Sequence, residues 1–190
     1  MLTKWKQYKQ ELREKNRFLY HIVDWVESII VALILALIIR QFAFQTSEVL
    51  SGSMIPTLMI KDRVIVNKLV YRYYGQMNRG DIVLFRSTIK PPRDFIKRLV
   101  GLPGEEIKIR SGMILINGKS VDESKWNVKW DNSNFGPFRI PENSYFFVGD
   151  NRPDSYDSRF WGPVPGKNII GKAELIIWPP LRVRLLFTSN

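Results

Sequence analysis

An apolar stretch near the N-terminus constrains this chain more than any other feature. From Trp25 to Phe44 the sequence has charges only at Glu27 and Arg40, and the run Ile29–Ile39 consists of Ile, Val, Leu and Ala alone. A helix of about 20 residues spans about 30 Å, the thickness of the hydrocarbon core of a bilayer. We therefore expect a transmembrane anchor helix at residues 22–45. A buried core helix and a removable signal peptide are the alternatives.

The residues that flank this stretch predict its orientation. Residues 1–21 carry six basic side chains against two acidic ones, with aromatic residues between them. Basic flanks stay in the cytoplasm, and no small-x-small cleavage site closely follows Ile39. We therefore expect a basic cytoplasmic segment at 1–21, an uncleaved anchor, and residues 46–190 on the outer side of the membrane.

The amino-acid composition limits which partners the chain can bind and which catalytic groups it can use. The net charge of +11 favours an anionic partner, either nucleic acid or anionic lipid head groups. The chain has no Cys and a single His, which excludes disulfides and thiolate chemistry and argues against a zinc site. We expect no metal and no cofactor.

After the apolar stretch the pattern becomes that of short strands separated by Gly and Pro. The expected strands are Arg63–Val70, Asp81–Arg86, Asp94–Val100, Glu106–Arg110, Met113–Ile116, Ser144–Val148 and Ile169–Ile177. Asn117-Gly118 predicts a tight hairpin turn, because such a turn needs positive φ at both central residues. We expect a mostly β domain at 46–190, in which 119–138 is a possible variable insertion.

One short segment, Ser51–Leu58, brings two serines and a glycine into a turn-like setting close to the anchor. Ser53 is either a turn former or a nucleophile. A serine nucleophile needs a base, and the predicted topology puts the sole histidine, His21, on the other side of the membrane. A Ser-His-Asp triad is therefore excluded, and a lysine remains as the amine base.

Lys97 is the best candidate for that base. In a strand it shares a face with Phe95 and Leu99, so its amine can be desolvated, and burial lowers the pKa of a lysine towards neutrality. The alternative is a solvent-facing lysine that packs its stem along the strand.

Four ordered segments of the chain resemble the signature segments of bacterial type I signal peptidases, which are serine proteases that remove signal peptides from exported proteins. The segments are Ser51–Leu58, Arg79–Phe85, Phe95–Glu105 and Gly149–Arg159. The resemblance runs from about residue 46 to 180 and extends to the membrane anchor. It implies a β-rich catalytic fold with a single N-terminal transmembrane helix.

The resemblance also implies a role for individual residues. Ser53 would be the nucleophile and Lys97 its general base, with the Ser53 N–H and the Ser51 hydroxyl as the oxyanion hole. Ser155 matches the serine that orients the lysine amine.

Further residues are assigned around this centre by the same resemblance. Asp157 and Arg159 match a supporting ion pair. The shallow apolar pockets for small residues before the cut are assigned to Val49, Leu58, Val64 and Ile96. Leu50 departs from the proline often found before this motif.

These features predict a membrane-anchored serine endopeptidase whose partners are signal peptides of exported preproteins and anionic membrane lipid, in the bacterial plasma membrane. Three alternatives remain open. They are a catalytically silent, membrane-anchored scaffold, a self-cleaving Ser/Lys protease, and a basic nucleic-acid binder, which the anchor argues against.

Overall fold

The computed structural model describes residues 2–73, 75 and 77–186 and divides into two compact units, 1–43 and 44–190. The first unit has two helices, α1 (Leu2–Lys15) and α2 (Arg17–Phe42). Asn16 separates them, and its side chain accepts a hydrogen bond from the Leu19 N–H at the start of α2. The break between the helices therefore has a capping residue.

Helix α2 contains the apolar stretch. Residues Arg17–Leu37 are long and apolar enough to cross a membrane, with a mean hydropathy of 1.9 and no burial against the rest of the described protein. Two acidic residues near the start of α2, Asp24 and Glu27, each lie 2.6 Å from the ammonium group of Lys9 in α1.

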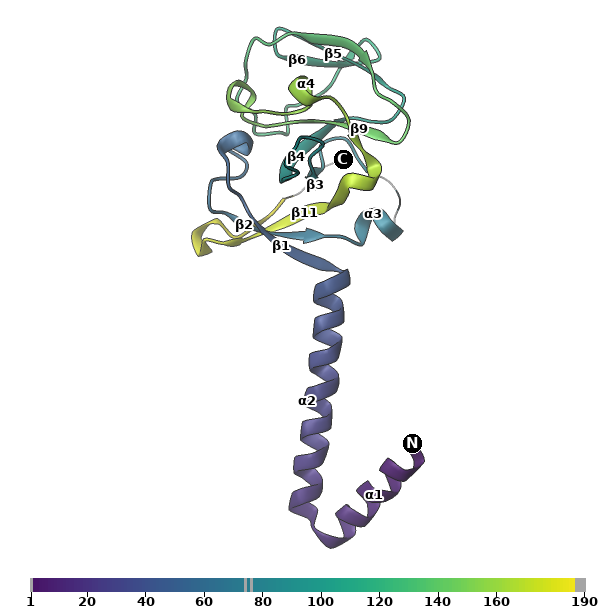
Figure 1. Cartoon of the computed structure of the whole chain (residues 1–190). Coiled ribbons are helices and arrows are strands. Elements are labelled where there is room, and N and C mark those ends of the chain that lie inside the picture. Colours follow the sequence, from purple (N-terminus) through teal and green to yellow (C-terminus); the bar gives the residue numbers. More distant parts are fainter. Residues whose placement is uncertain (1, 74, 76, 187–190) are drawn as a thin grey trace. The chain divides into compact units, whose positions relative to one another are not determined.

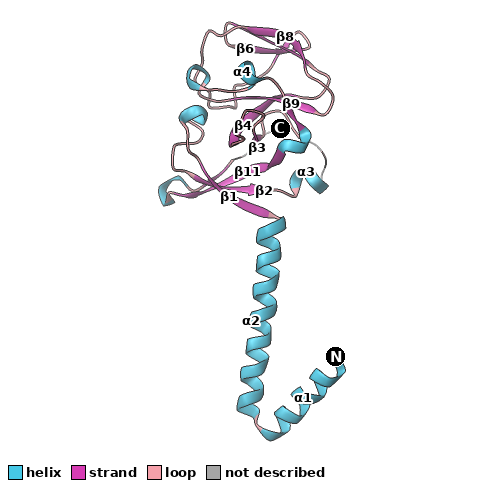
Figure 2. Ribbon diagram, in the orientation of Figure 1, coloured by secondary structure: helices cyan, strands magenta, loops and turns pink. Residues whose placement is uncertain are grey.

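The second unit is mostly β, as expected from the sequence (Figures 1 and 2). Its first sheet has the strand order β1-β2-β11-β3-β4-β9-β10, with β12 also paired to β11, and the second has the order β7-β6-β5-β8. The strands of the first sheet are β1 (Phe44–Glu48), β2 (Arg63–Asn67), β3 (Ile82–Arg86), β4 (Asp94–Gly101), β9 (Ser144–Val148), β10 (Val164–Pro165), β11 (Ile169–Trp178) and β12 (Arg184–Leu185). Those of the second are β5 (Glu106–Arg110), β6 (Met113–Ile116), β7 (Lys119–Ser120) and β8 (Phe135–Arg139). All strand pairs within the two sheets are antiparallel.

Short helical turns connect these strands. They are η1 (Gly52–Met54), α3 (Val70–Tyr73), η2 (Arg152–Asp154), α4 (Ser158–Trp161), η3 (Gly166–Asn168) and η4 (Pro180–Arg182). The predicted hairpin is confirmed, because Asn117 and Gly118 both have positive φ and Ile116 pairs with Lys119. The segment 119–138 begins with strand β7 and ends within β8, so it is a loop only between them.

Strand β4 separates two of the three buried apolar clusters. Phe95 and Leu99 pack into the cluster that contains Phe85 and Phe147, whereas Ile96 packs against the cluster of β2, β11 and η1. The alternation of faces predicted for this strand is therefore confirmed. It places the side chain of Lys97 on the Phe95 face, among aromatic residues.

Candidate active site

A turn of 3-10 helix, η1, positions Ser53. Its backbone carbonyl accepts a hydrogen bond from the Asn151 N–H at 3.0 Å, and the Asn151 side-chain amide donates to the Gly52 carbonyl at 3.0 Å. The chain after β9 is thus fastened directly to the serine turn. Gly149 makes this close approach possible, because a Cβ there would lie 2.4 Å from the Ser53 carbonyl oxygen.

Strand β4 brings Lys97 to the same turn. Its amine, Nζ, is hydrogen-bonded to Oγ of Ser53, and the lysine is 3% exposed. Its Nζ also lies 5.7 Å from the centre of the Phe95 ring. Ser53 and Lys97, 44 residues apart, are therefore in direct contact, with the serine itself 7% exposed.

Burial sets the protonation behaviour of the lysine. Desolvation lowers the pKa of Lys97 from 10.5 to about 8, with a smaller lowering from the positive charge of Arg159. The negative charge of Asp157 opposes this effect without cancelling it. About a tenth of the amine is therefore neutral at pH 7 and about half at pH 8.

The predicted oxyanion donors flank the serine hydroxyl. Oγ of Ser51 lies 3.1 Å from Oγ of Ser53, and either atom can donate. The Ser53 N–H lies in the first turn of η1, where a backbone N–H has no acceptor within the helix. A hydroxyl and a free N–H next to a nucleophile are suited to binding a developing oxyanion.

The hydroxyl of Ser155 is buried and makes no hydrogen bond to Lys97 or to any other described residue, so its orienting role stays a prediction. It packs against Gly149, where an added Cβ would lie 2.2 Å from it. An unpaired buried hydroxyl is uncommon in folded proteins. Its place beside the Gly149 contact puts it close to the serine turn.

The expected ion pair between Asp157 and Arg159 is present and shapes the following loop. Nε of Arg159 donates to Asp157 at 2.9 Å, and the fully buried carboxylate also accepts from the Gly149 N–H at 3.0 Å. Arg159 further pairs with Asp131 at 2.7 Å. This ion pair therefore holds Gly149 and the segment 119–138 in place and makes no direct contact with Ser53.

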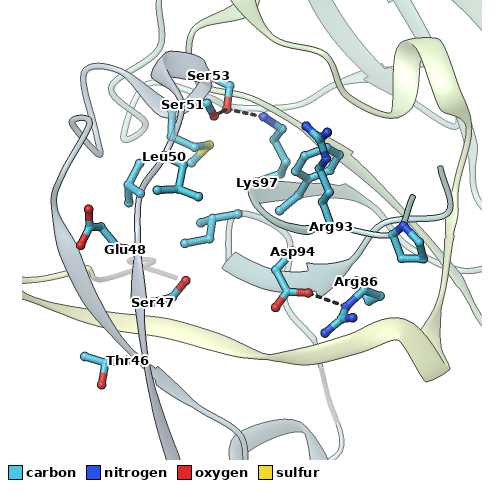
Figure 3. Close-up of a pocket in the computed structure, with 15 residues that line it drawn as sticks. Thr46, Ser47, Glu48, Leu50, Ser51, Ser53, Arg86, Arg93, Asp94 and Lys97 are labelled. Atoms are coloured by element: carbon cyan, nitrogen blue, oxygen red, sulfur yellow. Dashed lines mark hydrogen bonds and ion pairs between the residues drawn. The ribbon is translucent and has the colours of Figure 1, made fainter. Parts of the chain in front are cut away.

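A pocket of about 710 Å³ leads away from the serine and lysine between β1 and β4 (Figure 3). Val49 and Ile96 line it, in agreement with their assignment to the substrate pockets. Leu58 and Val64 do not line it, because both are fully buried in the hydrophobic core behind it. Apolar character alone did not distinguish a pocket wall from the core.

The backbone on both sides of this pocket has unpaired edges. Strand β1 pairs with β2, on its other side, and the half of β4 before Arg98 pairs with β3, whereas β9 joins β4 from Arg98 onward. The pocket runs along Thr46–Ser51 of one strand and Asp94–Lys97 of the other. Exposed strand edges of this kind bind an extended peptide by main-chain hydrogen bonds.

Two contacts that support the site were not predicted from the sequence. Asn151 fastens the serine turn, and Asp150 forms a buried ion pair with Arg98 at 2.6 Å while also accepting a hydrogen bond from Thr57, in the turn after Ser53. Polar residues that directly follow the buried strand β9 were the available signal. Within the described residues, no group of three or more His, Asp or Glu side chains is arranged to hold a metal.

Comparison with known proteins shows the family to which the chain belongs. The family described as "Signal peptidase, peptidase S26" matches residues 22–178. Signal peptidase I of Leptolyngbya laminosa is 40% identical over 169 residues, 85% of this chain and 82% of that protein. Signal peptidase I P of Bacillus subtilis subsp. natto is 38% identical over 190 residues, 93% of this chain and 98% of that protein.

A solved structure of a signal peptidase I from Enterococcus faecalis V583 is 34% identical, covers 51% of this chain and 96% of that chain, and has a TM-score of 0.41. The family match covers most of the chain, including the serine turn, strand β4 and the loop after β9. The chain therefore belongs to the signal peptidase family, peptidase S26, and is a serine endopeptidase.

Proposed function

We propose that this chain cleaves signal peptides from exported preproteins, with Ser53 as nucleophile and Lys97 as general base. The observation that carries the proposal is the hydrogen bond between Nζ of Lys97 and Oγ of Ser53 at a buried position. The described residues that line the pocket include no histidine to serve as the base instead.

The chemistry follows from the protonation state of the amine. Neutral Lys97 accepts the proton of the Ser53 hydroxyl as its oxygen attacks the scissile carbonyl. The ammonium that forms gives the proton to the leaving amine. A water then attacks the resulting ester, with the same amine as base, and the serine is released.

The oxyanion donors complete this scheme. As the carbonyl carbon becomes tetrahedral, negative charge develops on its oxygen. The Ser53 N–H and the Ser51 hydroxyl, which lies 3.1 Å from Oγ of Ser53, are the groups available to stabilise it.

Substrate binding uses the pocket between β1 and β4. An extended chain along the unpaired edges places its small side chains against Val49 and Ile96, two of the residues that line the pocket. Because Leu58 and Val64 are fully buried, they support this wall from behind.

Helix α2 supplies the membrane anchor in this proposal, with residues 1–21 in the cytoplasm and the β-rich domain 46–190 outside. The apolar stretch Arg17–Leu37 and the basic residues before it support this orientation. The excess positive charge can attract either anionic lipid or nucleic acid. We favour anionic lipid, because a membrane anchor keeps the protein next to lipid head groups. Binding to vesicles that is independent of anionic lipid content would contradict the lipid preference.

The proposal is tested with the full chain in detergent and a preprotein whose signal ends in Ala-x-Ala. Ser53→Ala and Lys97→Ala should each lower kcat/KM by about 1000-fold or more, because the nucleophile and its base act as a unit. The matched controls are Ser120→Ala and Lys119→Ala, both exposed on β7. These controls should cleave at the wild-type rate.

Cleavage by either active-site variant at the wild-type rate would overturn the Ser53/Lys97 pair. If no form of the protein cleaved the preprotein, the scaffold alternative would be favoured. Cleavage of the chain itself in place of the added preprotein would favour the self-cleaving alternative.

A further inference from the structure

The end of the pocket away from Ser53 is lined by charged side chains. Figure 3 shows Ser51, Ser53 and Lys97 at one end, and Arg86 with Asp94 at the other. Nε of Arg86 lies 2.5 Å from the Asp94 carboxylate, and both side chains are partly exposed. The charge of Arg86 is therefore balanced by a partner on the neighbouring strand.

Arg93 lines the same pocket, between Lys97 and the Arg86–Asp94 pair in Figure 3, and it has no acidic partner among the described residues. It is exposed, its backbone N–H donates to the Ser87 hydroxyl, and its guanidinium makes no hydrogen bond or ion pair with any described residue. On the opposite wall the acidic side chain of Glu48 is already paired with Arg63 at 3.3 Å. Arg93 therefore adds to the pocket a positive charge that neither Asp94 nor Glu48 balances.

The register of β4 gives the position of this charge along a bound substrate. Asp94 precedes Lys97 by three residues, a distance of about 10 Å along a strand. An extended substrate advances at the same rise per residue, and its cut bond lies at Ser53 next to Lys97. The fourth residue before the cut is then level with Asp94, and the fifth with Arg93.

We infer that Arg93, together with the Arg86–Asp94 pair, forms a subsite that selects for an acidic side chain at the fourth or fifth position before the cut. The same subsite disfavours Lys and Arg there. This inference rests on the proposed function, because it takes the direction of the substrate from the pocket that begins at Ser53. Arg93 acts as a specificity residue and takes no part in the chemistry.

The expected preference is modest and depends on salt. Exposed ion pairs contribute little, so kcat/KM should be about fivefold higher for a peptide with Asp at the fourth or fifth position than for one with Lys. The difference should appear mainly in KM. The Asp-to-Lys ratio of kcat/KM should fall towards one when the salt concentration is raised from about 0.1 M to about 1 M, because the Debye length shortens from about 10 Å to about 3 Å.

The experiment uses the full chain in detergent and peptides that differ only at the fourth and fifth positions, as Asp, Asn or Lys. Arg93→Gln should reduce the Asp-to-Lys ratio of kcat/KM to about one or two, and Arg93→Lys should retain most of it. Asp94→Asn should raise the ratio, because it leaves Arg86 without its partner. The control is Arg110→Gln, an exposed position on β5 in the other sheet, which should not change the ratio.

Equal cleavage of the Asp and Lys peptides by the wild-type protein would overturn this subsite and leave the proposed function intact. A preference that Arg93→Gln leaves unchanged would also overturn it. Failure of the wild-type protein to cleave even the Asn peptides would instead contradict the proposed function. Cleavage of the neutral Asn peptides therefore tests the proposed function independently of the Arg93 subsite.

Discussion

Two neighbouring cations on strand β4, Lys97 and Arg98, are buried to nearly the same degree on opposite faces of the strand but have very different surroundings. Lys97 is 3% exposed and Arg98 is 4% exposed. Arg98 donates to both oxygens of Asp150, at 2.7 and 2.6 Å, and to the Gly80 carbonyl at 2.7 Å. Lys97 has the Ser53 hydroxyl and the Phe95 ring, and no carboxylate among the described residues within ion-pair distance.

This difference separates a structural cation from a reactive one. A buried guanidinium with a bidentate carboxylate keeps its charge and fixes the elements that it joins. A buried amine without a carboxylate is shifted towards its neutral form, which is the form that can take a proton. The same strand therefore provides a fixed brace on one face and, in the proposed mechanism, a base on the other.

The largest effect on stability is expected from breaking the buried ion pair between Arg98 and Asp150. Arg98→Met leaves the fully buried Asp150 carboxylate without its cation, which should lower the free energy of unfolding of the β domain by about 3 to 5 kcal/mol. Urea unfolding followed by Trp fluorescence measures this. The double variant Arg98→Met/Asp150→Leu should recover most of the loss. A single variant within about 1 kcal/mol of wild type would show that the pair is not a brace.

Replacement of the unpaired cation, Lys97, is expected to raise the free energy of unfolding instead of lowering it. Lys97→Met removes an amine whose charged form is penalised by burial, so the variant should be more stable than wild type at pH 7 by about 2 kcal/mol. The folded pKa of about 8 lies below the usual 10.5, so well below pH 8 both states are protonated and the penalty is complete, and at pH 7 it is nearly so. Between pH 8 and 10.5 the unfolded state binds more protons, so wild-type stability rises and the difference should disappear.

The matched control for this variant is Lys119→Met, at an exposed position, which should show no such pH dependence. If Lys97→Met destabilised the domain at pH 7, the comparison between the two cations would fail. A gain that persisted unchanged above pH 10.5 would assign the effect to packing rather than to charge.

The smallest effect on stability is expected at Ser155. Its buried hydroxyl has no partner, so Ser155→Ala removes no hydrogen bond and should change the free energy of unfolding by less than about 1 kcal/mol. If this hydroxyl orients the Lys97 amine during the reaction, as the family resemblance implies, kcat should fall about tenfold with little change in KM. Ser155→Thr, which keeps a hydroxyl, should retain more activity. An unchanged kcat in Ser155→Ala would remove the orienting role.

Much of the fold could be predicted from sequence because the strands are short and sharply punctuated. The bounds of β5, β6 and β9 agree with the predicted ranges, and β4 extends one residue further, to Gly101. The strand predicted at Arg63–Val70 is too long. It ends at Asn67, whose side chain accepts hydrogen bonds from the next turn and starts α3 there.

Strand β8 could not be predicted from the local sequence pattern. It contains Gly136-Pro137, a pair that favours a turn, and it forms because it pairs with β5 across the second sheet. The bounds of the apolar helix show a similar limit. Helix α2 begins at Arg17 rather than at residue 22, because the capping residue Asn16, and not the first apolar residue, starts it.

The candidate site could be predicted where a residue type is chemically necessary. A serine without an accessible histidine requires another base, and a lysine flanked by apolar residues meets that need. The Arg98–Asp150 pair and the Asn151 contact with the serine turn could not be found in this way, because their partners lie 52 or more residues apart and many polar residues would fit the local sequence equally well. Core residues such as Leu58 and Val64 could not be told from pocket-lining residues in this way either, since core and pocket walls share the same composition.

The most direct test of this account is the titration of the Lys97 amine by NMR in protein labelled at its lysine side chains, with the Lys97→Met variant used to assign the resonance. The account predicts a pKa of about 8 for Lys97 and an acid limb of kcat/KM at the same pH. A Lys97 pKa near 10.5 in the folded protein would contradict the account, because the amine would then be charged and unable to act as the base for Ser53.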